Sequence, residues 1–416
     1  MRVCLDWAFL FLGWFMKTNE IKFREDLYPR FEPNQQAIER YSNSIEYLPP
    51  IIINHNNILI DGFHRWKAHQ LAKQDEIKVE IIETASEQEV KKLAYKLNSI
   101  HGLQLTDDEK KKFAREMFGL MTEQEIADTI SVSQRSVYNW TKTQRENAKA
   151  EQERQILDIY LRAWNTQESI AKEFKISQKN VSDILSKFCT DAKNTKEFKP
   201  FLYNIWNTPK GNETDHFGSF PLIFMKNLLH YHTNQMDIIY DPFAGAGTTI
   251  DACKNMLRRY CCYDLIVKPG REKDILQWDI TQGLPDMPKP DFVFLDPPYW
   301  KQAKGKYSEN ENDFGNMDLD SFIFEMAKLI DFLCDWDIQR IAFVISPTQY
   351  SNDDKKFVNH YKDIIEMFPK KYDEEMLYEL PYSTEQYNGT QVNVMKKENK
   401  VISLTRLLSV WMKNGI

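Results

Sequence analysis

Two short segments in the C-terminal half of the chain contain the residues best suited to chemistry. The first segment, residues 241–249, reads Asp-Pro-Phe-Ala-Gly-Ala-Gly-Thr-Thr and follows the apolar run 236–240. The second segment, residues 296–299, reads Asp-Pro-Pro-Tyr and ends the apolar run 291–295. Because glycine or proline follows each apolar run, we predict two buried strands that end in tight loops. Proteins of the α/β class bind their ligands outside this end of the strands.

The glycine-containing segment suits a loop that binds a ligand through its backbone. Gly245 and Gly247 have no side chain, so the backbone can pass close to a ligand. A helix predicted to start near Thr248 would direct its free amide groups toward the same place. A tight strand-to-helix turn without a ligand has the same pattern, so this segment alone leaves both interpretations open.

The proline-containing segment suits recognition of an amine on a planar ring. Two consecutive prolines can neither continue a sheet nor open a regular helix, so the loop is stiff. Asp296 and the carbonyl group of Pro297 can accept hydrogen bonds from the amine, and Tyr299 can stack on the ring. A stiff loop at a strand end without chemistry is the alternative. The presence of both segments in one chain favours the chemical interpretation.

Together the two segments resemble the amino-methylating DNA methyltransferases, which use S-adenosylmethionine and carry an Asp/Asn/Ser-Pro-Pro-Tyr motif. The resemblance implies an α/β fold with a Rossmann-like, seven-stranded, mostly parallel sheet, and double-stranded DNA as the substrate. It assigns the catalytic role to Asp296, Pro297, Pro298 and Tyr299. Aspartate in this motif favours adenine N6, and cytosine N4 stays the alternative. Methylation of cytosine carbon 5 is disfavoured, because none of the cysteines follows a proline as that chemistry normally requires.

The resemblance also implies where the cofactor binds. His216, Phe220 and Pro221 would flank its methionine part, and the glycine loop would cradle the methionine end. Asp264 would bind the ribose hydroxyls and Asp279 the adenine amine, although each acid taken alone is also typical of a solvated strand end. The complete set is His216, Phe220, Pro221, Asp241, Pro242, Phe243, Ala244, Gly245, Gly247, Thr248, Asp264 and Asp279.

The order of the motifs, with the glycine loop first, argues against the circularly permuted arrangement found in part of this family. No long insertion separates Asp279 from Asp296, so we expect DNA specificity to reside elsewhere in the chain. Residues 301–318 resemble the mobile loop that closes over a flipped base, and a plain solvated loop is the alternative. Further elements are predicted after it, with a helix at 319–332 and strands at 340–346, 372–380 and 401–410.

The middle of the chain contains two copies of one unit, residues 122–140 and 166–184. In each copy a threonine caps a short helix with an Ile-Ala pair, and a turn ending in serine precedes a helix that starts with glutamine. This spacing resembles a helix-turn-helix, whose second helix reads DNA in the major groove. The resemblance gives as DNA contacts Gln134, Arg135, Ser136, Tyr138, Gln178, Lys179 and Asn180. A packed helical spacer without DNA contact is the alternative.

Residues 48–82 predict strands around a helix and resemble the N-terminal domain of ParB-like proteins. In that family Gly-x-x-Arg at a helix N-terminus binds phosphate, and the matching residues here are Gly62 and Arg65. A structural role, in which Arg65 pairs locally, is the alternative. His101 stands where the nucleotide-binding members usually have arginine, so nucleotide hydrolysis is not expected.

Length and composition agree with several domains. The chain of 416 residues is 42% hydrophobic, which supports packed cores in roughly two to four domains. We predict an apolar extension at 1–15 with Met16 as the natural start, an α+β ParB-like domain at 16–106, an all-α region at 107–200 and a methyltransferase domain at 201–416. The apolar extension is too short to span a bilayer.

The net charge and the cysteine content bear on the binding partners of the chain and on its location in the cell. The net charge of −7 does not indicate nucleic-acid binding, but basic side chains need only cluster on one face for that role. Six cysteines without a Cys-x-x-Cys pair suggest a reduced cytoplasmic location and no structural zinc. We therefore predict a cytoplasmic protein with no metal and no membrane contact.

Three functions of different kinds remain open. The leading one is a site-specific DNA methyltransferase that acts on an exocyclic base amine. The second is a ParB-like DNA-binding regulator with an inactive methyltransferase domain, which the intact Asp296 disfavours. The third is methylation of RNA, which the tandem helix-turn-helix units disfavour. The sequence leaves undecided whether a companion restriction nuclease or a homodimer is involved.

Overall fold

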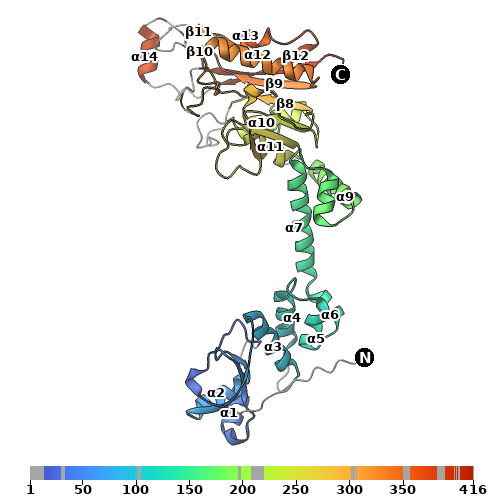
Figure 1. The fold of residues 1–416 in the computed structure, drawn as a ribbon, viewed down its shortest axis with the longest axis vertical. Helices are drawn as coiled ribbons and strands as arrows, with labels where there is room; N and C mark the ends of the chain where they lie inside the picture. The colour runs from blue at the N-terminus through green and yellow to red at the C-terminus, as the bar shows by residue number, and fades with distance from the viewer. Residues whose placement is uncertain are drawn as a thin grey trace. The chain divides into compact units, whose positions relative to one another are not determined.

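The computed structural model describes residues 14–29, 33–100, 105–194, 198–207, 220–300, 305, 307–349, 357–381, 389–397, 399, 401 and 403–415. The chain divides into two compact units, Met1–Glu151 and Gln152–Ile416. Helix α7, Lys142–Leu161, passes through the point of division (Figure 1). The second copy of the repeat therefore belongs to the same unit as the C-terminal sheet.

The first unit begins with a small α+β fold, as the sequence predicts. Its sheet has the order β1-β4-β2-β3. The strands are β1 (Trp14–Lys17), β2 (Ile51–Asn54), β3 (Leu59–Asp61) and β4 (Glu76–Ile82), and the helices are α1 (Gln35–Ser42), α2 (Phe63–Leu71) and α3 (Glu87–Ile100). The sequence analysis placed residues 1–15 in an apolar extension ahead of the first domain. In the structure, Trp14 and Phe15 of this stretch belong to strand β1 and pair with β4. His101 lies outside the described residues.

The two copies of the repeat have the same local geometry. The first copy comprises α5 (Glu123–Ile130) and α6 (Gln134–Trp140) after helix α4 (Asp107–Glu116), and the second comprises α8 (Gln167–Phe174) and α9 (Gln178–Asn194). Thr122 and Thr166 each cap the first helix through a capping box. The turn contains a left-handed residue at Ser131 in one copy and at Lys175 in the other. The predicted duplication is therefore a duplication of structure.

The second unit contains a seven-stranded sheet of order β12-β13-β9-β8-β5-β6-β7. Five neighbouring strands are parallel, namely β9 (Arg340–Ile345), β8 (Phe292–Leu295), β5 (Ile238–Asp241), β6 (Arg259–Asp264) and β7 (Ile275–Gln277). The last two strands in the chain, β12 (Tyr372–Pro381) and β13 (Thr405–Lys413), are antiparallel. The predicted seven-stranded, mostly parallel sheet is confirmed.

Helices cover both faces of this sheet (Figure 1). They are α10 (Leu222–His232), α11 (Thr248–Met256), α12 (Leu319–Asp335) and α13 (His360–Ile365); the unit also has α14 (Gly389–Lys397) and the short strands β10 (Thr348–Gln349) and β11 (Phe357–Val358). Successive strand residues alternate between two buried clusters, with Ile239 packed among residues of α10 and α11 and Tyr240 among residues of α12. Because both faces are buried, the parallel strands read as continuous apolar runs.

The second copy of the repeat is joined to this sheet along strand β6. Strand β7 pairs with residues 262–264 of β6, and the backbone amide of Ala163 donates to the Tyr260 carbonyl in the part that β7 leaves uncovered. The Arg259 guanidinium stacks on the Tyr160 ring and donates to the carbonyls of Tyr160, Ala163 and Asn165 at 3.1, 2.8 and 2.7 Å. Arg259 of β6 thus satisfies one carbonyl group in the last turn of helix α7 and two in the segment that follows the helix.

Replacement of Arg259 by alanine is expected to lower the free energy of unfolding by about 2 kcal/mol, because buried carbonyl groups lose their donor. Urea denaturation of both proteins measures this difference. Arg154→Ala is the matched control, because Arg154 is exposed on the same helix α7 and should change stability by less than about 0.5 kcal/mol. Equal midpoints for the two variants would show that the Arg259 contacts do not hold α7 on the sheet.

Candidate active site

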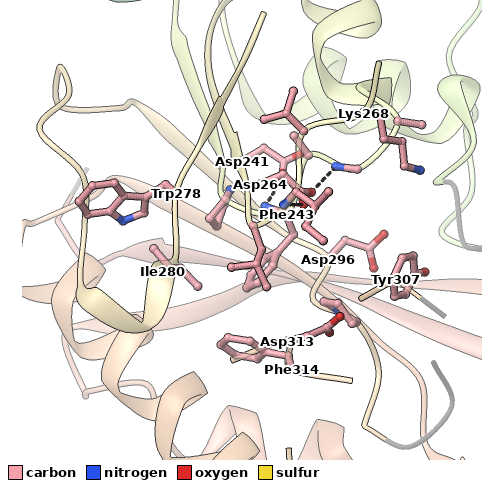
Figure 2. A pocket seen from close by; sticks show the side chains of 18 of the residues that line it. Asp241, Phe243, Asp264, Lys268, Trp278, Ile280, Asp296, Tyr307, Asp313 and Phe314 are labelled. Carbon is pink, nitrogen blue, oxygen red and sulfur yellow. Dashed lines mark hydrogen bonds between the residues drawn. The ribbon is translucent and has the colours of Figure 1, made fainter. Parts of the chain in front are cut away.

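A cavity of about 280 Å³ lies at the carboxyl ends of strands β5, β6, β7 and β8. Figure 2 shows Trp278 and Ile280 on one side of this cavity and Asp296 and Tyr307 on the other. Most of the residues predicted for the cofactor and for catalysis line it, namely Phe220, Asp241, Pro242, Phe243, Ala244, Gly245, Thr248, Asp264, Asp279, Asp296 and Pro298. The structure thus brings the two sequence motifs together in one site.

Asp241 fixes the shape of the glycine loop. Its carboxylate accepts a hydrogen bond of 2.5 Å from the Thr249 hydroxyl and one of 2.9 Å from the Phe243 amide. Burial raises the pKa of Asp241 to about 7, and these two hydrogen bonds oppose the rise. The loop then reaches helix α11 through Gly245 and Gly247, which have φ angles of 52° and 87°. Only glycine adopts this left-handed region readily, which explains the choice of residue at both positions.

Asp264 ends strand β6, Asp279 follows strand β7 by two residues, and both acids line the cavity. The Asp264 carboxylate accepts from the amides of Gly245 and Ile266 at 2.7 and 3.0 Å, and burial raises its pKa. A carboxylate can accept about four hydrogen bonds, so Asp264 retains capacity for the hydroxyl groups of a ligand. Burial alone would also raise the pKa of Asp279. Its hydrogen bonds, of which the one from the Thr281 side chain has the largest effect, instead hold this pKa below its usual value.

Asp296 is the acid of the proline-containing motif. The Tyr299 hydroxyl donates to its carboxylate at 3.0 Å. Burial raises the pKa of Asp296 to about 6, although the nearby charge of Arg406 and the hydrogen bond from Tyr299 act in the opposite direction. Asp296 is therefore ionised at neutral pH and able to accept hydrogen bonds from an amine.

The other predicted site residues that the structure describes are not among those that line the cavity. Pro221 precedes helix α10, Gly247 precedes helix α11, Pro297 is buried, and Tyr299 packs against both core clusters of the sheet. His216 lies outside the described residues.

Several residues of the cavity were missed in the sequence. They are Ala246, Thr249, Leu265, Ile266, Val267, Lys268, Pro269, Trp278, Ile280, Phe294, Tyr307, Ser308, Asn312, Asp313 and Phe314. Part of this set could have been predicted by including the residues next to each predicted acid, because residues 265–269 follow Asp264 and Ile280 follows Asp279. Residues 307–314 belong to the segment 301–318 that the resemblance marks as a loop over the base, but nothing in the sequence placed them beside Asp279 and the glycine loop.

The cavity is lined both by hydrogen-bond acceptors and by apolar side chains. Asp264 and Asp279 are among the acceptors. Ile280 and Phe314 are among the apolar side chains. Phe314 is 3% exposed and packs edge-on against Phe243 with ring centroids 5.2 Å apart. This donor and acceptor set agrees with a nucleoside-containing ligand.

The predicted DNA-contact residues lie at the beginning of helices α6 and α9. Gln134, Arg135 and Tyr138 are exposed on α6, whereas Ser136 is partly buried and its amide donates to the capping side chain of Ser133. On α9 the residues Gln178, Lys179 and Asn180 are all exposed. Apart from Ser136 these side chains are therefore accessible.

Gly62 and Arg65 pack against each other at the start of helix α2. Gly62 precedes helix α2 with a φ angle of 100°, and a Cβ atom there would lie 2.9 Å from Nε of Arg65. The Arg65 guanidinium donates to Asp61 at 2.9 Å. Both observations agree with the structural alternative for Arg65.

Histidines and acids give no further site among the described residues. His232 contacts Glu375 and the Tyr378 hydroxyl at 3.2 and 2.9 Å, so its ring is engaged in the core. In the described part of the chain, no group of three or more His, Cys, Asp or Glu side chains is arranged to hold a metal ion. Nor does any helix in that part have the length and apolar character needed to cross a membrane.

Comparison with known proteins gives one matching family model, described as DNA methylase, which aligns with residues 14–267, more than half of the chain. No curated protein sequence matches.

Among solved structures, the chromosome-partitioning protein ParB from Caulobacter crescentus, complexed with CTP-gamma-S, is 22% identical, with 31% of this chain and 76% of that chain covered and a TM-score of 0.20. Precorrin-6y C5,15-methyltransferase from Geobacter metallireducens is 14% identical, with 50% and 92% covered and a TM-score of 0.28. The 1,6-didemethyltoxoflavin-N1-methyltransferase of Burkholderia thailandensis is 11% identical, with 46% and 77% covered and a TM-score of 0.29.

Proposed function

The chain belongs to the DNA methylase family, and from this premise we propose that it methylates the N6 amine of adenine at a specific sequence of double-stranded DNA. Enzymes of this family take the methyl group from S-adenosylmethionine, whose sulfonium makes that group electrophilic. The observation that carries the proposal is the single cavity shared by the glycine loop and by Asp296. Cytosine N4 stays the alternative target, and the aspartate of the motif is what favours adenine.

In this proposal Asp296 and the Pro297 carbonyl accept the two hydrogens of the base amine. The lone pair of an aromatic amine is delocalised into the ring and is a poor nucleophile. Two acceptors fixed by a stiff loop draw the nitrogen toward tetrahedral geometry and orient its lone pair for attack. Catalysis is then orientational and electrostatic, and no covalent intermediate with the protein forms.

The cofactor would be held by the residues that end the parallel strands. We assign its methionine end to the loop from Asp241 to Gly247, with Phe220 beside it. Asp264 would accept from the ribose hydroxyls and Asp279 from the adenine amine. The position of both acids on the cavity and the remaining acceptor capacity of Asp264 support this assignment.

DNA recognition is proposed for the two helical repeats. Helix α6 and helix α9 each expose polar side chains in their first turn, where a recognition helix meets base edges. For the segment 16–106 we propose a ParB-like domain, whose Arg65 has a structural role. We keep the predicted domain boundaries in this proposal, with the helical region beginning after residue 106 and the methyltransferase domain after residue 200.

Replacement of both Gln134 and Arg135 by alanine is expected to relax or abolish site choice while cofactor affinity stays at the wild-type value. A good bidentate contact to a base contributes about 1–3 kcal/mol of discrimination. Methylation rates on duplexes with single-base changes measure this effect. The control is Asn139→Ala at the end of α6, which is exposed but distant from the first turn. Unchanged discrimination in the double variant would contradict a reading role for α6.

The experiment that tests the proposed function compares DNA from cells that express the chain with DNA from cells that express Asp296→Ala. Long-read sequencing distinguishes N6-methyladenine from N4-methylcytosine and reports the sequence context. A motif methylated only in the presence of the wild-type chain is the expected result. Modified cytosine would correct the target base, and a motif also methylated by the variant would refute the role of Asp296. Absence of any modification would favour a regulator without activity or an RNA substrate.

A further inference from the structure

Residues 307–317, here named the cavity loop, form a compact structure that connects the proline-containing motif to helix α12. Asp313 accepts from the Ser308 hydroxyl at 2.8 Å and from the Gly315 amide at 2.9 Å. The Asn316 side chain donates to the carbonyls of Ser308 and Asn310, both at 2.8 Å. These bonds give the cavity loop a defined shape of its own.

Three contacts fix the cavity loop to the rest of the site. The Asn312 side-chain amide donates to the Asp279 carboxylate at 2.7 Å. Phe314 is buried against Phe243 of the glycine loop. At the end of the loop, the Met317 carbonyl accepts from the indole of Trp300, which directly follows Tyr299, at 3.1 Å. The loop therefore contacts two of the proposed cofactor residues, Asp279 and Phe243, and also the residue that directly follows the proline-containing motif.

Hydrogen bonds from Thr281 and Asn312 hold the two oxygens of the Asp279 carboxylate. One oxygen of the Asp279 carboxylate accepts from the amide and hydroxyl of Thr281 at 3.0 and 2.7 Å, and the other accepts from Asn312. A carboxylate held at both oxygens cannot rotate, and a fixed acceptor loses less entropy when a ligand donates to it. The same hydrogen bond holds Asn312, Asp313 and Phe314 at the side of the cavity.

We propose that Asn312 is a positioning residue for cofactor binding, which orients Asp279 and holds the cavity loop at the side of the cavity. The proposal rests on the proposed function, because it takes Asp279 as the acceptor of the cofactor's adenine amine. It adds a residue that no sequence motif marks. The same loop also contacts Trp300, the residue that directly follows the proline-containing motif.

Titration calorimetry of the full chain with S-adenosylhomocysteine tests the proposal without any activity assay. Asn312→Ala is expected to bind this ligand about tenfold more weakly, the effect of losing one hydrogen bond to a charged group. Asn312→Asp keeps the side-chain shape but places a second carboxylate against Asp279, so it is expected to bind more weakly than Asn312→Ala. This second variant also serves if the alanine variant does not fold. The matched control is Glu311→Gln, an exposed neighbour in the same loop, whose affinity should equal that of the wild type.

A double-mutant cycle separates positioning from general loosening of the loop. In an Asp279→Asn background, Asn312→Ala is expected to cost much less affinity than it does in the wild type, because the orientation of the charged acceptor is already lost. An equal loss in both backgrounds would overturn the proposal. Equal or tighter binding by Asn312→Ala in the otherwise native chain would also overturn it, and tighter binding would show that the amide competes with the ligand. If the wild type itself does not bind S-adenosylhomocysteine, the proposed function fails together with this inference.

Discussion

Replacement of Asp296 by alanine is expected to reduce the rate of methyl transfer by about 10²- to 10³-fold, the usual effect of removing one preorganised group that stabilises developing charge. Asp296 lies on the cavity beside the glycine loop, where its carboxylate is available to the base amine. The affinity for S-adenosylhomocysteine should not change, because this ligand carries no amine that we assign to Asp296. Single-turnover methylation of a duplex containing the target sequence, with calorimetry on the same proteins, measures both quantities.

The pH dependence of the wild type provides a second measurement of the same group. Burial raises the pKa of Asp296 to about 6, and only the ionised form accepts hydrogen bonds at both oxygens. The rate should therefore fall as the pH decreases through about 6 and level off above it. The charged and titratable groups around Asp296 are Arg406 and Tyr299, which lower its pKa, and the buried Asp241, which interacts with it.

Asp296→Asn distinguishes Asp296 from the other acids of the cavity. Asparagine also occurs at this position of the family motif, and its carbonyl still accepts a hydrogen bond, so part of the activity should remain. The decrease near pH 6 should disappear, because the amide does not titrate. A variant that keeps the same decrease would show that another group controls the rate. Asp241, whose pKa burial raises to about 7, would then be the first candidate.

The sheet and its loops could be predicted from the sequence because their signals are local. Buried parallel strands read as apolar runs, and glycine or proline marks where each run ends. Helix α11 begins at Thr248 as predicted, and strands β12 and β13 lie close to the ranges predicted for the last two strands. The repeat was visible because capping residues recur at a constant offset.

The parts that were not predicted depend on contacts between residues far apart in the chain. Nothing near Arg259 in the sequence indicates that its guanidinium binds the end of helix α7, or that Ala163 covers the free part of β6. The bond between Asn312 and Asp279 likewise depends on the folded loop, and asparagine in a polar loop gives no signal for it.

Gly247→Ala is expected to weaken binding of S-adenosylhomocysteine roughly 10- to 100-fold, because two penalties act at this position. The φ angle of Gly247 is 87°, and a residue with a side chain loses about 1–2 kcal/mol in this left-handed region. A Cβ atom there would also lie 3.0 Å from the guanidinium of Arg271, which is held by two hydrogen bonds of 2.9 and 2.7 Å to Asp251 of helix α11. Either Arg271 or the glycine loop would therefore have to shift.

Gly270 provides the matched control for this prediction, because it separates strain from crowding. Its φ angle is 86°, nearly that of Gly247, but a Cβ atom there would meet nothing within 4 Å. Gly270→Ala should therefore lower stability by about 1–2 kcal/mol without the same loss of affinity. Adding Arg271→Ala to Gly247→Ala should recover the part of the affinity that crowding removes. Equal affinity losses for the two glycine variants would mean that backbone strain alone acts and that Arg271 has no part in shaping the cofactor loop.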